Sequence, residues 1–230
     1  MIDVIVISSL SISSVFHSSH SMKPIFLLLP IAALFSAFSV AAAPSPVASF
    51  AACDDHSLAV VQSPLFKDLV PSTVENGQIK LSGGTKSDMG QRWMFAKPAE
   101  IDGMSLTGFY AEDTDLMGTR IISWGFYAKQ TPNELHTQLE KAGGPRMDMS
   151  QGLYARAEIW SHGKSNWQPE DPSATAGKLV VDSAERVFLI EPAPQELTTG
   201  SKGMFTCSIQ GKVNEAMLKS SRPDLLSSAH

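Results

Sequence analysis

The chain has 230 residues, of which 43% are apolar and 18% are charged. This apolar share is sufficient for a hydrophobic core and excludes a wholly disordered chain. The formal net charge is -5, and the basic residues form no cluster. Because phosphate contacts need concentrated Lys and Arg, this charge argues against a dedicated nucleic-acid-binding protein.

Residues 22–43 have the order of a secretory signal peptide. Lys23 supplies a positive start, residues 25–40 are apolar, and small residues follow. We expect cleavage after Ala42, with a cut after Ala51 as the alternative. An uncleaved anchor is disfavoured because the apolar stretch is short for a membrane span.

The remaining sequence suggests a simple layout. Beyond the N-terminal region no run of about 20 apolar residues occurs, so we expect no membrane span after cleavage. The length of the mature chain favours one domain and a periplasmic or secreted location. The predicted layout is an upstream extension or mis-start at 1–21, a signal peptide at 22–42, a single domain at 43–222 and a flexible tail at 223–230.

Both cysteines, Cys53 and Cys207, belong to the predicted mature chain. In an oxidising compartment the simplest arrangement is one disulfide between them. Closing so long a loop is worth about 5 kcal/mol in a chain-entropy estimate. Residues 50–53 also faintly resemble the lipobox of bacterial lipoproteins, which would make Cys53 a lipidation site, but Phe50 stands where a Leu-like residue is expected.

The first half of the mature chain is rich in predicted strands. Ser63 followed by Pro64 predicts one or two helical turns, because serine caps helices and proline fits their first position. Asp102-Gly103 predicts a hairpin turn between two strands. The clearest strand carries apolar residues on both faces, which is typical of a central strand. The strands are expected over 78–82, 91–97, 104–110 and 119–129.

The second half begins with the clearest helix. Thr131 and Glu134 form a capping box, and Leu135 and Leu139 follow at helical spacing. His136 is expected on the solvated side of this helix. Further strands are expected over 153–160, 178–182, 186–191 and 204–210, with a short turn at 183–185 and a closing helix over 213–220.

These elements predict an α+β fold. Strands joined by short turns pair antiparallel, so we expect a mainly antiparallel sheet with one or two helices packed on one face. An internal duplication is a further hypothesis, because a strand runs into 129–134 and another into the similar segment 210–215. The identity over six positions is so low that chance is the favoured interpretation.

Catalytic motifs are incomplete in this sequence. Residues 103–107 lack the last glycine of a nucleophile elbow. Ser161 and Lys164 have Ser-x-x-Lys spacing, but the serine is expected at the end of a strand rather than on a helix. No zinc or calcium motif is complete, so we expect no metal and no cofactor. His56 and His162 could meet only through the fold, which leaves a hydrolase or metal-dependent enzyme as the alternative function.

One feature favours a binding role. The segment 161–177 is long and polar, and ordered loops of this length are often functional. Its Trp167, with Trp160 and His162 beside it, is the expected binding residue set, because exposed tryptophans often anchor interfaces. The alternative is a compact loop whose Trp167 packs back on the domain. We therefore predict a binding or inhibitory module, in preference to an enzyme, that presents this loop, with 111–118, to another protein or an envelope component.

Overall fold

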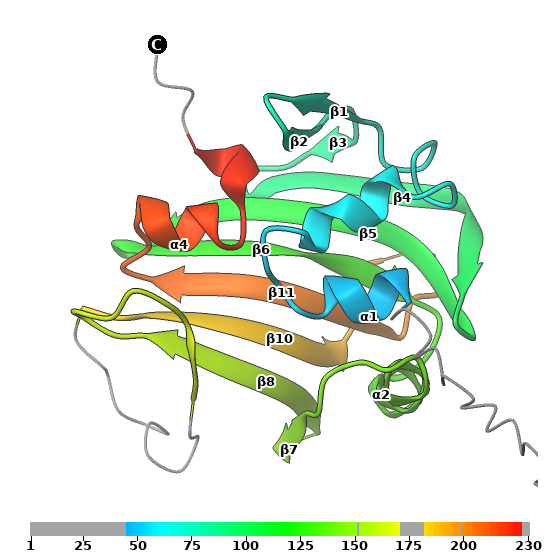
Figure 1. Ribbon diagram of the computed structural model, residues 1–230. Helices are drawn as coiled ribbons and strands as arrows, with labels where there is room; N and C mark the ends of the chain where they lie inside the picture. Colours follow the sequence, from blue (N-terminus) through cyan, green and yellow to red (C-terminus); the bar gives the residue numbers. More distant parts are fainter. Residues whose placement is uncertain (1–44, 151, 171–181, 198, 227–230) are drawn as a thin grey trace, which may run out of the picture. The chain divides into compact units, whose positions relative to one another are not determined.

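The computed structural model describes residues 45–150, 152–170, 182–197 and 199–226. The predicted signal peptide and upstream extension lie outside these residues, and so do 171–181. Within the described part a nine-stranded antiparallel sheet dominates, with the order β3-β4-β5-β6-β11-β10-β8-β7 and β9 added beside β8 (Figure 1). The expected α+β fold, a mainly antiparallel sheet with helices, is confirmed.

The strands are long in the middle of the sheet and short at its margins. A separate ribbon pairs β1 with β2. The strands are β1 (Ser72–Glu75), β2 (Gln78–Leu81), β3 (Thr85–Lys86), β4 (Gly90–Ile101), β5 (Met104–Leu116), β6 (Thr119–Ala128), β7 (Asp148–Ser150), β8 (Leu153–Trp160), β9 (Gln168–Pro169), β10 (Ala184–Pro192) and β11 (Gly203–Gly211).

Local sequence chemistry explains the central hairpin. Asp102 and Gly103 both have positive φ, at 51° and 77°, as the tight turn between β4 and β5 requires. The strand predicted to be central, β6, does pair on both sides, with β5 and with β11. Its residues Ile122, Trp124 and Phe126 are fully buried on one face.

We call the side of β6 that carries Ile122, Trp124 and Phe126 the inner face of the sheet. The N-terminal segment crosses it as α1 (Pro46–Phe50) and the 3-10 helix η1 (Ser57–Gln62). Phe50 lies at the centre of an aromatic cluster, with ring centroids 5.4 Å from Phe126, 6.5 Å from Phe188 and 5.7 Å from Phe205. This segment therefore closes the core over three adjacent strands. The predicted turns over 63–69 are present as hydrogen-bonded turns rather than as a helix.

Helix α2 (Pro132–Lys141) begins where the capping box predicted it. Thr131 and Glu134 make both reciprocal hydrogen bonds, and Leu135 and Leu139 are buried. The expectation for His136 was wrong, because its side chain is only 17% exposed and its ring stacks on Tyr154 at 4.0 Å. The strand that passes beneath the helix supplies this aromatic surface.

The charged residues of β8 face the core. Glu158 lies opposite Arg186 on β10, and Arg156 lies opposite the buried Phe188. The Glu158 carboxylate accepts hydrogen bonds from Arg156 Nη1 at 2.7 Å and from Arg186 Nε at 2.9 Å. Burial lowers the pKa of Arg186, whereas Glu158 raises it. These three side chains form a partly buried ion-pair cluster.

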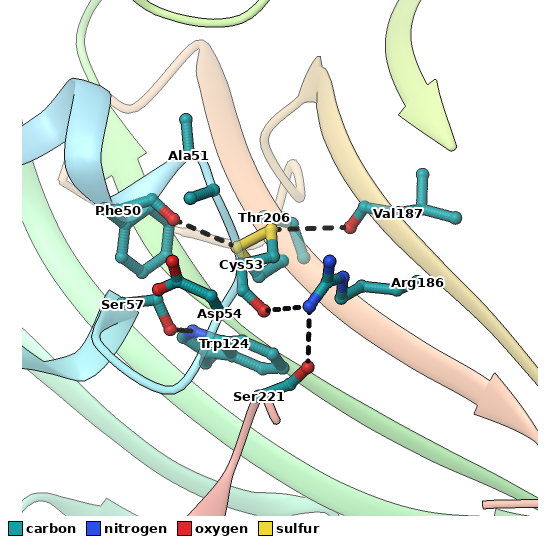
Figure 2. Close-up of a disulfide and its surroundings, with 12 residues drawn as sticks. Phe50, Ala51, Cys53, Asp54, Ser57, Trp124, Arg186, Val187, Thr206 and Ser221 are labelled. Carbon is teal, nitrogen blue, oxygen red and sulfur yellow. Dashed lines mark hydrogen bonds between the residues drawn. A yellow bond between two sulfur atoms is a disulfide. The ribbon is translucent and has the colours of Figure 1, made fainter. Parts of the chain in front are cut away.

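The predicted disulfide between Cys53 and Cys207 is confirmed (Figure 2). It joins the turn between α1 and η1 to β11, with the two Cα atoms 5.4 Å apart. Arg186 Nη1 reaches Cys53 O at 3.5 Å and Ser221 Oγ at 3.1 Å. Trp124 Nε1 donates to Ser57 Oγ on the same side of the bridge. The disulfide and these hydrogen bonds hold the N-terminal segment onto the sheet. The disulfide also uses the Cys53 sulfur that lipidation would need.

The outer face of the sheet carries its own aromatic pair. Tyr110 and Tyr127 are buried and stack at 5.0 Å, and the Tyr110 hydroxyl shares a hydrogen bond with Thr206 Oγ1. Burial raises the pKa of both tyrosines, that of Tyr127 to about 12, with Arg92 acting in the opposite direction on Tyr127.

The chain ends with α4 (Glu215–Lys219) and the 3-10 helix η2 (Pro223–Leu225). Residues 223–226 were expected in a flexible tail, but Leu225 and Leu226 pack against the core. The predicted turn at 183–185 was wrong in part, because β10 already begins at Ala184.

Each half of the sheet contains a meander of three long strands followed by a helix, β4-β5-β6 before α2 and β8-β10-β11 before α4, which is the arrangement that a duplication would give. The sequence match, however, does not fall on equivalent positions. Asn214 is the N-cap of α4, whereas Asn133 lies two residues beyond the N-cap Thr131 of α2. Chance therefore remains the favoured explanation of that match.

Candidate functional site

The two tryptophans of the predicted binding set pack into the protein. Trp160 and Trp167 are only 7% and 9% exposed and meet edge to face at 5.4 Å. Trp167 Nε1 donates to Ser220 Oγ at 2.9 Å, and the Arg186 guanidinium lies 4.9 Å from its ring. An exposed Trp167 was therefore the wrong interpretation, and the alternative, in which Trp167 packs back on the domain, is the arrangement found. The short β9 brings the loop back beside β8, so the Trp167 indole packs between Trp160 and the C-terminal segment.

His162 and its neighbours remain on the surface. Residues 162–166 are exposed, while Trp160 Nε1 donates to Lys164 O at 2.8 Å. The buried tryptophans therefore act as the rigid base of this loop. The polar residues above them are the ones a partner can reach. The second part of the predicted loop, 171–177, lies outside the described residues.

The register of the sheet places both predicted loops at one end. Arg120 pairs with Gly211, Gly211 with Ala184, and Ala184 with Trp160. Because neighbouring strands lie about 4.8 Å apart, this row spans about 14 Å from the β5–β6 hairpin to the end of β8. Figure 1 shows the hairpin tip, the end of β11 and the loop after β8 on the same side of the sheet. We call the largely exposed segments 113–119 and 161–166 the loop surface.

The hairpin tip of the loop surface is apolar. Leu116 is 60% exposed and Met117 is 99% exposed. Met117 and Gly118 have φ of 55° and 84°, so both adopt the left-handed conformation of a tight hairpin turn. Asp115 Oδ1 accepts from Gly118 N, and Arg120 makes two hydrogen bonds to the Asp113 carboxylate. These bonds fix the turn that displays the two apolar side chains.

A basic pocket of about 400 Å³ opens beside the other segment of the loop surface. Trp160 and Met217 contribute its buried apolar part. Its charged and titratable lining residues are His162, Lys164, Asp182 and Lys212. Lys212 Nζ donates to the Asp182 carboxylate, and this bond lowers the pKa of Asp182, with a smaller lowering from His162. Among the described residues, no carboxylate lies within ion-pair distance of Lys164.

A second pocket, of about 430 Å³, lies on the far side of the hairpin between β4, β5 and η2. It is the larger of the two, but four of its six charged lining residues are held in ion pairs. Glu112 pairs with Arg92, and Asp113 pairs with Arg120. Its Arg222 pairs with a neighbouring aspartate of η2. Charges that are already held in ion pairs attract a partner less, so we favour the basic pocket.

The residues considered for an enzyme site are not brought together. His56 lines pockets beside η1, whereas His162 lines the basic pocket. The polar partner found for the His56 ring is Asp55, at 3.8 Å. Among the described residues, no group of three or more His, Cys, Asp or Glu side chains is placed to hold a metal ion. The hydrolase or metal-enzyme hypothesis stays a prediction.

The described helices are all too short or too polar to cross a lipid bilayer. Comparison of the chain with family models, with characterised proteins and with solved structures gave no match. The loop surface and the basic pocket are therefore the features from which a function can be inferred.

Proposed function

We propose that the protein is an exported binding module, binding or inhibiting another protein through the loop surface. A periplasmic or secreted location is part of this proposal. It is supported by the disulfide, since such bonds persist mainly in oxidising compartments, and by the signal-peptide pattern of residues 22–42.

The observation that carries the proposal is Met117. A left-handed turn position favours Gly, Asn or Asp, and a methionine there costs about 1 kcal/mol. Its side chain is 99% exposed, so burial within the protein does not offset that cost. Neither backbone preference nor folding therefore explains the residue. A contact with a partner explains it, because an apolar side chain gains free energy when another surface covers it.

The test separates binding from folding. Met117→Asn removes the apolar side chain and introduces a residue that tolerates the turn, so the variant should unfold at the same temperature or higher. The partner is captured from envelope extract with the unmodified protein, identified by mass spectrometry and then titrated. The affinity of Met117→Asn for this partner should be about tenfold weaker, as for loss of an interface anchor.

The matched control is Met149→Asn. Met149 is also exposed, at 66%, but it lies on β7 near the opposite end of the sheet. This control should bind as the unmodified protein does. Equal partner affinity for the Met117 and Met149 variants would refute a role for the loop surface.

A further inference from the structure

The basic pocket differs in charge from the protein that surrounds it. The whole chain has a formal net charge of -5. The pocket instead gathers Lys164, Lys212 and His162 from two separate chain segments, against the single carboxylate of Asp182. A local excess of positive charge on an acidic protein attracts negative groups selectively, because like-charged surfaces elsewhere repel them.

The pocket already contains one bound carboxylate, that of Asp182. Lys212 binds Asp182, and both Lys212 and His162 favour the ionised form of that side chain. With Lys212 engaged in this pair, Lys164 is the cation left to meet an incoming group. The loop that carries it is fixed because Trp160 Nε1 binds the Lys164 carbonyl oxygen.

The apolar part of the pocket fits the rest of such a ligand. Trp160 and Met217 are nearly buried and line the same pocket as the charged groups. A glutamate side chain has a short apolar stem and a charged end, so its stem can contact these two residues while its carboxylate meets Lys164. A polyanion such as nucleic acid fits less well, because the acidic remainder of the chain would repel it.

From this arrangement we propose that the basic pocket binds an acidic peptide segment of the partner protein, with a glutamate or aspartate carboxylate at Lys164. This inference depends on the proposed binding function and specifies the chemistry of the partner.

The direct test uses labelled hexaglutamate and hexaglutamine peptides in fluorescence polarisation. The full protein should bind hexaglutamate about tenfold more tightly than hexaglutamine, and added salt should weaken the binding. Lys164→Glu should weaken hexaglutamate binding about tenfold. The control Lys129→Glu makes the same change of charge on an exposed residue that follows β6 at the opposite end of the sheet, and it should change the affinity less than about twofold.

Two results would overturn the inference. The first is equal weakening by the Lys164 and Lys129 variants, which would mean that only net charge matters. The second is displacement of hexaglutamate by inorganic phosphate at the same concentration of charge, which would mean a simple anion site.

Partner capture separates this inference from the proposed function. If Met117→Asn abolishes capture while Lys164→Glu leaves it unchanged, the loop surface binds a partner but the acidic-peptide inference fails. If Lys164→Glu weakens both hexaglutamate binding and capture while Met117→Asn captures normally, the acidic-peptide inference is upheld and the role of Met117 in the proposed function fails.

Discussion

Glu158 forms ion pairs with two arginines beside the N-terminal segment. Removing its charge should therefore lower the free energy of unfolding. In Glu158→Gln the side chain keeps its size but loses its charge. The ion pairs to Arg156 and Arg186, whose nitrogens lie 2.7 and 2.8 Å from Glu158 Oε2, would then be lost. The two guanidinium groups would face each other without a counter-charge.

The size of the effect follows from burial. Breaking a buried ion pair by removing one partner costs about 3–5 kcal/mol. The Glu158 and Arg186 side chains are 16% and 9% exposed, whereas Arg156 is 23% exposed, so solvent screens part of the repulsion. We therefore expect the free energy of unfolding to fall by about 3 kcal/mol, the lower end of that range. This corresponds to a melting temperature lower by roughly 6–12 °C for a chain of this size.

Urea unfolding followed by tryptophan fluorescence and thermal melts measures this change. Asp113→Asn is the matched control, because it removes a carboxylate from Arg120 in a pair whose side chains are both 36% exposed. That variant should lose no more than about 1 kcal/mol. If Glu158→Gln costs no more than Asp113→Asn, the reasoning from burial is wrong.

Two other predictions concern the disulfide and one glutamate. Replacing Cys53 and Cys207 together with alanine should lower the free energy of unfolding by about 2–5 kcal/mol, measured by urea titration, and a loss below about 1 kcal/mol would contradict the role given to the bridge. Burial raises the pKa of Glu191, so the folded protein binds that proton more tightly than the unfolded chain, and stability falls as pH rises through the raised pKa. Glu191→Gln should therefore raise the melting temperature by about 1–3 °C at pH 7, and this gain should disappear near pH 4. An equal gain at both pH values would contradict this account.

Local patterns predicted the elements whose signals are contained in a few adjacent residues. The capping box of Thr131 and Glu134 specifies its helix start because both hydrogen bonds are made within one turn. The alternation in β6 predicted a central strand because residues on both faces are apolar. The disulfide was predictable because the chain has only two cysteines.

Side-chain surroundings supplied by distant segments were not predictable from the sequence. Trp167 is buried because Ser220 and Arg186 approach it from the C-terminal segment and from β10. His136 is covered because β8 places Tyr154 beneath it. The same limit applies to the candidate site. Its His162 was singled out from the sequence, but Lys212 was not, because only the pairing of β10 with β11 brings Lys212 close to Asp182.

The position of the disulfide has a consequence for how the chain matures. Cys53 belongs to the first segment that the structure describes and Cys207 to the last strand, 154 residues later. Because synthesis starts at the N-terminus, the Cys53 thiol is made 154 residues before the Cys207 thiol with which it pairs. Because the sequence has no third cysteine, no incorrect disulfide can form within the chain. The rate of thiol disappearance therefore reports directly when the two ends of the fold first meet.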